Sequence, residues 1–363
     1  MKYYIISGEK SGDMHAANMV AELREKDKDI KIRAWGGKKL KEQGAYIVKD
    51  IKELAFMGFW EVFINLPSIL RNISFCKKDI LKFNPDVLIL VDYPGFNFRI
   101  ADFAKSNNIK IHYYISPQIW AWNESRIKKI RKNIDKMFVI LPFEKEFYRK
   151  HDFNVDFVGH PLIDEINKKS YNLFTESNKD IIALLPGSRR QEISQILPTM
   201  LSIVDNFNQF QFIIAATDNI EQEFYRKIVG KKNVIIVNDQ TYGVLSTAKA
   251  ALVTSGTATL EAALFKVPQV VCYKTNFLSY IISRLLVRTR YISLVNIVMD
   301  SLVVTELIQN KLNQKSLTQS LSNILDDDNR DIIINKYNQL EDKLGNTGAS
   351  KRLANLIYED ISS

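Results

Sequence analysis

The sequence predicts an α/β protein made of two domains. Short apolar runs of strand length recur along the chain, and each is followed by a turn of small residues and then by a segment of helix formers. The chain has 363 residues, of which 46% are hydrophobic and 25% are charged, and this suits two soluble domains with separate cores. We therefore expect open α/β sheets, in which ligands bind at the carboxyl ends of the strands.

One such unit spans residues 250–273. An apolar run leads into the turn Thr254-Ser255-Gly256-Thr257, a helical segment follows, and a second apolar run closes the unit. The turn offers free backbone amides and the positive end of a helix dipole, which suit a diphosphate. Glu261 lies about one helical turn beyond Thr257, within reach of a ribose attached to that diphosphate. Alternatively, Ser255 or Thr257 caps a helix and Glu261 is solvated.

A second unit begins with the apolar run 181–185, which is followed by Pro186-Gly187-Ser188-Arg189. Gly187 allows the backbone to approach a ligand closely, and Arg189 offers a fork of donors to phosphate oxygens. Two such turns in one domain favour a nucleotide pocket.

The first unit of the chain joins an apolar run at 2–7 to the turn Gly8-Glu9-Lys10-Ser11-Gly12-Asp13. Its glycine spacing differs from GxGxxG, and the next apolar run ends in Gly36-Gly37 instead of an acidic residue, so a nicotinamide enzyme is disfavoured. We expect Glu9, Ser11 and Asp13 to hold a polar part of a second substrate. Asp13 can equally cap a helix.

Two further stretches of the N-terminal half suit catalysis and sugar binding. Asp92 follows an apolar run, at the strand end where a general base would be placed, although Pro94-Gly95 also allows it a role in a turn. Beyond the next run lie Gln118, Trp120 and Trp122. Flat indoles beside an amide suit a sugar ring, although tryptophan is more often a core residue.

Two features indicate an acidic or lipid-like partner. The net charge is +9, and residues 99–150 contain twelve Lys and Arg against five Asp and Glu. Anionic lipid, nucleic acid and a plain solvated surface all match this charge, but no nucleic-acid-binding motif accompanies it. The apolar stretch 56–70 is too short to span a bilayer and suits an interfacial or acyl-chain-binding surface, or ordinary core. The side chains expected to face lipid are Phe56, Met57, Phe59, Trp60, Phe63 and Ile64.

Other classes are disfavoured. Cys76 and Cys272 are too few and too far apart for a disulfide framework or a metal site. The acidic triplets at 27–29 and 326–328 could mimic the DxD motif of metal-dependent sugar transferases, but both resemble surface turns. We therefore expect neither a metal nor a cofactor. The chain enters a strand at once, without a leader or a membrane span, so we expect a cytoplasmic protein or one attached to a membrane from that side. The oligomeric state is left open.

A series of motifs follows one another from about residue 7 to residue 309: GEKSGD, DYPGFNFRIA, YYISPQIWAW, FVGHPL, LLPGSR followed by Glu192, SGTATLEAAL with PQVVCYK, and YISLVN followed by ELIQ. Together they resemble the lipid-A-disaccharide synthase family of inverting glycosyltransferases. The resemblance implies a GT-B fold, with two Rossmann-like domains facing across a cleft. It implies an acceptor-binding domain at 1–166 with a lipid-facing surface, a UDP-sugar-binding domain at 167–340, and a helix at 341–363 that returns to the first domain.

The family transfers 2,3-diacylglucosamine from its UDP conjugate to the 6-hydroxyl of 2,3-diacylglucosamine 1-phosphate (lipid X), without a metal. Carried over by residue, the resemblance makes Asp92 the base. At the UDP it places Gly187, Ser188, Arg189, Ser255, Gly256, Thr257, Glu261 and Asn296. At the acceptor it places Gly8, Glu9, Ser11, Gly12, Asp13, Gln118, Trp120, Trp122 and Arg126. Leu294-Val295-Asn296 departs from the family's more usual Leu-Pro-Asn.

Both substrates are anionic lipids, so the resemblance also implies peripheral attachment to the cytoplasmic face of the inner membrane and no nucleic-acid partner. A UDP-sugar 2-epimerase of the same fold is the nearest rival, although it needs no lipid-facing surface. A non-catalytic basic protein that binds membrane or nucleic acid is a rival of another class. It leaves both phosphate-type turns and Asp92 unexplained.

Overall fold

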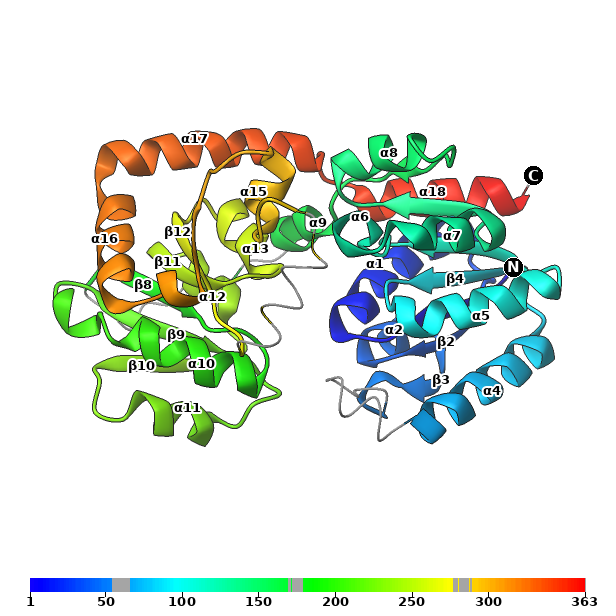
Figure 1. The fold of residues 1–363 in the computed structure, drawn as a ribbon. Coiled ribbons are helices and arrows are strands. Elements are labelled where there is room, and N and C mark those ends of the chain that lie inside the picture. Colours follow the sequence, from blue (N-terminus) through cyan, green and yellow to red (C-terminus); the bar gives the residue numbers. More distant parts are fainter. Residues whose placement is uncertain are drawn as a thin grey trace. The chain divides into compact units, whose positions relative to one another are not determined.

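The computed structural model describes residues 1–53, 66–168, 171, 179–276, 280, 287 and 289–362. Contacts within the chain divide it into two compact units (Figure 1). Unit 1 contains Met1–Asp164 and Leu344–Ser363, and unit 2 contains Glu165–Lys343. The C-terminal segment therefore belongs with the N-terminal unit. The domain boundaries expected after residues 166 and 340 lie close to these divisions.

Unit 1 is built on a parallel sheet of seven strands in the order β3-β2-β1-β4-β5-β6-β7. Side chains of β1 alternate between its faces: Tyr3 and Ile5 lie in one core cluster, and Tyr4 and Ile6 lie in another. Because both faces are covered, β4 is apolar throughout and β1 has a continuous run of large, buried side chains from Tyr3 to Ile6. The strands are β1 (Lys2–Ser7), β2 (Lys31–Gly36), β3 (Tyr46–Asp50), β4 (Val87–Val91), β5 (Lys110–Tyr114), β6 (Lys136–Val139) and β7 (Asp156–Phe157).

Helices cover both faces of this sheet. One cluster contains buried residues of α1 and α18, and the other contains residues of α4, α5 and α7. The helices are α1 (Lys10–Lys26), α2 (Lys38–Glu42), α4 (Leu66–Phe83), α5 (Pro94–Ser106), α6 (Ile119–Trp122), α7 (Ile127–Asn133), α8 (Pro142–Arg149), α9 (Pro161–Lys168) and α18 (Ala349–Ser362). The division between the units falls within α9.

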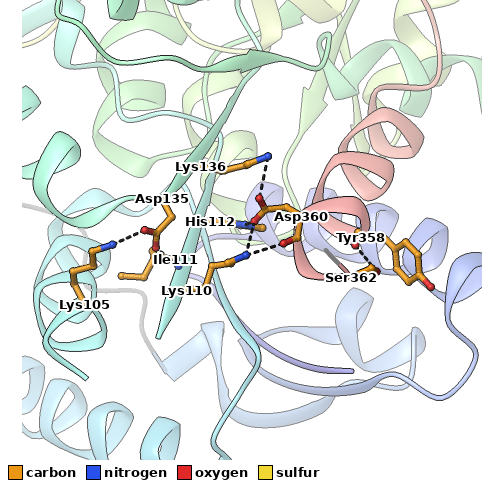
Figure 2. Close-up of polar contacts among 9 residues, drawn as sticks. All are labelled: Lys105, Lys110, Ile111, His112, Asp135, Lys136, Tyr358, Asp360 and Ser362. Atoms are coloured by element: carbon orange, nitrogen blue, oxygen red, sulfur yellow. Dashed lines mark hydrogen bonds and ion pairs between the residues drawn. The ribbon is translucent and has the colours of Figure 1, made fainter. Parts of the chain in front are cut away.

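One acidic residue anchors the C-terminal helix α18 to the sheet of unit 1. Asp360 Oδ2 lies 2.8 Å from Nε2 of His112 and 3.2 Å from Nζ of Lys110, and its Oδ1 lies 3.1 Å from Nζ of Lys136 (Figure 2). Partial burial opposes ionisation of Asp360, but these hydrogen bonds outweigh it and lower its pKa to about 2. Burial lowers the pKa of His112, so the attraction comes mainly from the two lysines.

Unit 2 contains a parallel sheet of six strands in the order β10-β9-β8-β11-β12-β13. The strands are β8 (Ile181–Leu185), β9 (Gln211–Ala216), β10 (Val234–Asn238), β11 (Ala248–Thr254), β12 (Gln269–Tyr273) and β13 (Thr305–Ile308). Its helices are α10 (Arg190–Leu201), α11 (Gln222–Val229), α12 (Thr241–Leu245), α13 (Ala258–Leu264), α15 (Leu294–Met299), α16 (Gln314–Leu325) and α17 (Asp327–Leu344). The prediction of parallel α/β units is confirmed for both units.

The strand order determines where each sheet can bind a ligand. The chain winds outward in both directions from neighbouring strands, β1 and β4 in unit 1 and β8 and β11 in unit 2. Ligands of open parallel sheets bind at the carboxyl ends of such strands. Loop 8–13 and Asp92 follow the first pair, and the turns at 186–189 and 255–257 follow the second. In the described part of the chain, every helix is too short or too polar to span a bilayer.

Candidate active site

A pocket of about 370 Å³ lies at the carboxyl ends of β8 and β11 in unit 2. It gathers seven of the eight residues predicted to bind the UDP: six come from two turns that are far apart in the sequence, and Glu261 comes from α13. Its lining consists of Leu185, Gly187, Ser188, Arg189, Glu192, Ala215, Thr217, Thr241, Thr254, Ser255, Gly256, Thr257, Ala258 and Glu261. The chain therefore brings both phosphate-type turns to one cavity, with a carboxylate on its wall.

The turn after β8 carries a cation into this pocket. Gly187 has a φ of +109°, which other residues rarely adopt, and a Cβ there would lie 2.8 Å from Oε2 of Glu192. Nη1 of Arg189 donates to Oε1 of Glu192 at 3.1 Å, while the arginine side chain remains 60% exposed. Its guanidinium is thus oriented and still accessible to an anion. The sequence alone did not identify Glu192 as the partner of Arg189. The spacing of three residues between them is nevertheless usual for an ion pair at the start of a helix.

The turn after β11 supplies backbone amides. At the start of α13, the amides of residues 259–261 donate to carbonyls of the preceding turn. The amides that come before residue 259 have no acceptor within the helix. Thr257 is the N-cap residue of α13, but its side chain makes no capping hydrogen bond, and Oγ of Ser255 donates to the carbonyl of Ile292 at 2.8 Å. The alternative in which these hydroxyls cap the helix is therefore wrong.

Glu261 stands on the pocket wall as a partly buried carboxylate. Burial raises its pKa to about 7, although the hydroxyl of Tyr242 donates to Oε1 at 3.2 Å and favours the charged form. The Tyr242 ring is itself packed against Tyr171 and Phe265, with ring centroids 5.1 and 5.4 Å away. Glu261 is thus held in place and can accept hydrogen bonds from ribose hydroxyls, and it is not the solvated residue of the alternative interpretation.

Asn296 lies outside the pocket lining and is wholly buried. Its Oδ1 accepts from the amides of Val303 and Val304 at 2.8 and 2.9 Å, and its Nδ2 donates to Val304 and Glu306 at 2.9 and 2.8 Å. The side chain is thus fully engaged within the protein. Its predicted contact with UDP stays a prediction, and the structure gives it an internal role.

Asp92 lies at the carboxyl end of β4 in a strained backbone. It and Tyr93 have φ values of +47° and +50°, which are costly for residues other than glycine and persist where the surroundings enforce them. The Nδ2 of Asn97 and the hydroxyl of Tyr113 each donate to the Asp92 carbonyl at 2.6 Å, and the Asp92 amide donates to Tyr114 at 3.0 Å. Neither supporting side chain could be deduced from its position in the sequence.

Two residues of the loop after β1 affect Asp92 and its neighbour Tyr93. A Cβ at Gly8 would lie 2.3 to 2.5 Å from ring atoms of Tyr93, so glycine makes room for that ring. Burial raises the pKa of Asp92 to about 6, and the charge of Glu9 adds to the rise. A carboxylate of this pKa is largely ionised at neutral pH and can still accept a proton.

The other predicted acceptor residues of segment 8–13 lie in the first turn of α1 and differ in their accessibility. Asp13 is 2% exposed, and its carboxylate accepts from the amides of Gly37, Lys39 and Leu40 at 2.6, 2.9 and 3.3 Å. It therefore caps α2, a helix that begins 25 residues further along the chain. The predicted acceptor contact of Asp13 stays a prediction, and the structure gives its carboxylate a capping role. In the same turn Ser11 is exposed and Gly12 is buried.

The residues of the motif at 118–122 differ in whether their side chains are bonded within the protein or exposed to solvent. Nε1 of Trp120 donates to Oε1 of Glu144 at 3.2 Å, and burial raises the pKa of Glu144 to about 7. Trp122 is 41% exposed, with the guanidinium of Arg126 4.5 Å from its ring centroid, and Gln118 is also exposed. Trp122, Arg126 and Gln118 are thus accessible to a ligand, whereas the polar edge of Trp120 is occupied.

The six predicted lipid-facing side chains between 56 and 64 lie outside the described residues. Part of the basic stretch is described: Lys128, Arg131 and Lys132 of α7 border an open concavity together with Lys150, His151 and Asp152. Among the residues that the structure covers, no group of three or more His, Cys, Asp or Glu could hold a metal ion.

Comparison with known proteins settles the family. Residues 3–358 match the family described as lipid-A-disaccharide synthetase. The chain belongs to this family. It is 38% identical to the lipid-A-disaccharide synthase of Syntrophus aciditrophicus, with 96% of this chain and 95% of the relative covered. It is 35% identical to the lipid-A-disaccharide synthase of Coxiella burnetii, with 99% and 98% covered.

Solved structures support the fold. The S. aureus MnaA–UDP complex has a TM-score of 0.71 at 15% identity, with 99% of this chain and 97% of that chain covered. A glycosyltransferase of kitacinnamycin has a TM-score of 0.70 at 12% identity, with 99% of each chain covered. The predictions of a GT-B fold and of a glycosyltransferase for lipid A disaccharide synthesis are confirmed. The 2-epimerases share the fold alone, so the family match favours the transferase over that rival.

Proposed function

We propose that this enzyme transfers 2,3-diacylglucosamine from UDP-2,3-diacylglucosamine to the 6-hydroxyl of lipid X in a single inverting displacement. The observation that carries the proposal is the unit 2 pocket, where Arg189, Glu261 and the amides of turn 255–257 meet. A diphosphate binds the arginine and the amides, and the ribose binds Glu261. Gly187 and Ser188 line the diphosphate end.

Asp92 is the general base of the proposed reaction. Its carboxylate takes the proton of the 6-hydroxyl while that oxygen forms a bond to the anomeric carbon. The bond between this carbon and the diphosphate breaks, and its electron pair leaves with UDP. A pKa of about 6 suits the task, because the group is ionised at neutral pH yet remains basic enough to accept a proton. No enzymatic nucleophile is needed for inversion.

The leaving group gains negative charge as the bond breaks. Donors that are already oriented stabilise such charge best, and loss of one typically costs about 10²–10³ in rate. Arg189, held by Glu192, and the amides of turn 255–257 are such donors. On the acceptor side, Gln118, Trp122 and Arg126 are the accessible side chains of the sugar-binding motif.

We also propose that the enzyme is peripheral on the cytoplasmic face of the inner membrane, where both lipid substrates are presented. In α4, which overlaps the end of the apolar stretch 56–70, Leu70, Phe75 and Leu81 are 55%, 48% and 49% exposed. Exposed apolar side chains beside Lys and Arg are typical of interfacial helices. Co-sedimentation with vesicles of increasing anionic lipid content tests this part of the proposal, and binding that does not depend on anionic lipid would contradict it.

The test of the reaction is an assay of the purified enzyme in detergent with UDP-2,3-diacylglucosamine and lipid X, with a chelator present. Formation of disaccharide and UDP in equal amounts is expected, and its persistence with chelator would support the metal-free mechanism. Asp92→Ala should lose turnover while UDP affinity stays near that of the unaltered chain. UDP release without disaccharide would favour hydrolysis or an epimerase-like reaction. Weak UDP binding with much residual turnover would overturn the assignment of Asp92.

A further inference from the structure

Glu306 of β13 holds residues 292–296, which are the end of a loop and the first turn of α15 and are bonded to a turn of the proposed UDP pocket. Its Oε1 accepts from the amide of Ser293 at 2.9 Å and from Nδ2 of Asn296 at 2.8 Å, and its Oε2 accepts from the amide of Ile292 at 3.1 Å. One partly buried carboxylate thus receives three separate donors from residues 292–296. Glu306 does not belong to the pocket lining.

The loop held by Glu306 reaches the pocket through one hydrogen bond. The Ile292 carbonyl accepts from Oγ of Ser255 at 2.8 Å, and Ser255 lines the pocket in the turn after β11. The amide of Ile292 is bonded to Glu306, so the same peptide segment is held from both sides. Three groups therefore form a continuous path from β13 to the turn that borders the pocket.

Asn296 is a second residue that holds this segment in place. Asn296 binds Glu306 through Nδ2 and the amides of Val303 and Val304 through Oδ1. Asn296 therefore ties residues 292–296 both to Glu306 and to the chain just before β13. A carboxylate suits this centre because it offers several acceptor sites and no donor, and charge-assisted hydrogen bonds to it are strong.

We propose that Glu306 is a positioning residue of the transferase, which sets the turn 255–257 for UDP by holding Ile292 against Ser255. The inference rests on the proposed function, in which this pocket binds UDP. Glu306 touches no substrate and acts through two intervening residues. Its loss lets the loop shift and releases the Ser255 hydroxyl, so the amides of the turn lose the geometry that a diphosphate requires.

The experiment is a double-mutant cycle on UDP affinity, measured by calorimetry well below the melting temperature of each variant. Glu306→Ala and Ser255→Ala are each expected to weaken UDP binding by about ten-fold, the usual effect of losing one well-placed hydrogen bond. The double variant should bind no more weakly than Glu306→Ala, because both changes break one path. Glu306→Gln retains an acceptor for Ser293 and should recover part of the affinity.

Asn313→Ala provides a matched control for general destabilisation. Oδ1 of Asn313 caps α16 by accepting from the amide of Ser316 at 3.0 Å, and it has no bond to the loop at 292–296. This variant should melt earlier but bind UDP as the unaltered chain does. In turnover, Glu306→Ala should raise KM for the sugar nucleotide and leave the pH profile set by Asp92 in place.

The outcomes separate this inference from the proposed function. Normal UDP binding by Glu306→Ala, or additive losses in the double variant, would overturn the positioning role alone. An equal loss of affinity in Asn313→Ala would also overturn it, because loss of stability would then explain the effect. Absence of UDP binding by the unaltered chain would overturn the proposed pocket and this inference together.

Discussion

Asp92→Asn is expected to abolish turnover and at the same time to stabilise the protein at neutral pH. Burial, with help from Glu9, raises the pKa of Asp92 from its usual 3.8 to about 6 in the folded chain. The unfolded chain releases this proton near 3.8, so the folded chain binds more protons between the two values. Above about pH 6 the ionised carboxylate therefore opposes folding, by at most about 3 kcal/mol.

Asparagine removes this charge and keeps the rest of the turn. The hydrogen bonds from Asn97 and Tyr113 go to the Asp92 carbonyl, which the substitution retains. We expect a gain of about 1–3 kcal/mol in the free energy of unfolding at about pH 8. Most of the gain should disappear by about pH 4, where Asp92 of the unaltered folded chain is itself protonated.

Urea unfolding of the full chain, followed by circular dichroism at these two pH values, measures the effect. Asp29→Asn is the control, since Asp29 is an exposed carboxylate of the same unit, and it should leave the difference unchanged. If Asp92→Asn lowers stability at the higher pH, or shifts it equally at both, then Asp92 is not a desolvated carboxylate. Its selection as the base would then lose its electrostatic support.

Three further predictions concern unit 1. Glu9→Gln removes a charge that raises the pKa of Asp92, so the loss of kcat/KM on acidification should move from about pH 6 to lower pH; an unmoved profile would contradict this. Gly8→Ala displaces the Tyr93 ring and should lower kcat at least about ten-fold with UDP affinity unchanged, whereas a change confined to UDP affinity would contradict it. Asp360→Asn should cost about 2 kcal/mol of stability at neutral pH, and the cost should vanish as the pH falls from about 4 towards 2, which urea unfolding at both pH values would check.

The sequence determined the α/β class, the strands β8, β11 and β12 of unit 2, and both turns of the unit 2 pocket. These features are local: an apolar run of strand length and a small-residue turn are visible without knowledge of the partners. Parallel sheets also bring such turns to one edge by geometry, and for this reason seven predicted residues meet in one pocket. β13 escaped prediction because its four residues, Thr305–Ile308, are two polar residues followed by two apolar ones, which is neither an apolar run of strand length nor an alternating pattern.

The tertiary structure alone decided what the buried polar residues do. Asp13 caps a helix beyond the next strand, Asp360 binds residues about 225 to 250 positions away, and Glu306 holds the start of α15, next to the residue that bonds to Ser255. The sequence shows the type of each residue, but its partner lies on another element. A buried polar side chain takes its role from the donors and acceptors that folding places around it. The raised pKa of Asp92 has the same origin, because desolvation depends on everything packed around the carboxylate and not on its neighbours in the sequence.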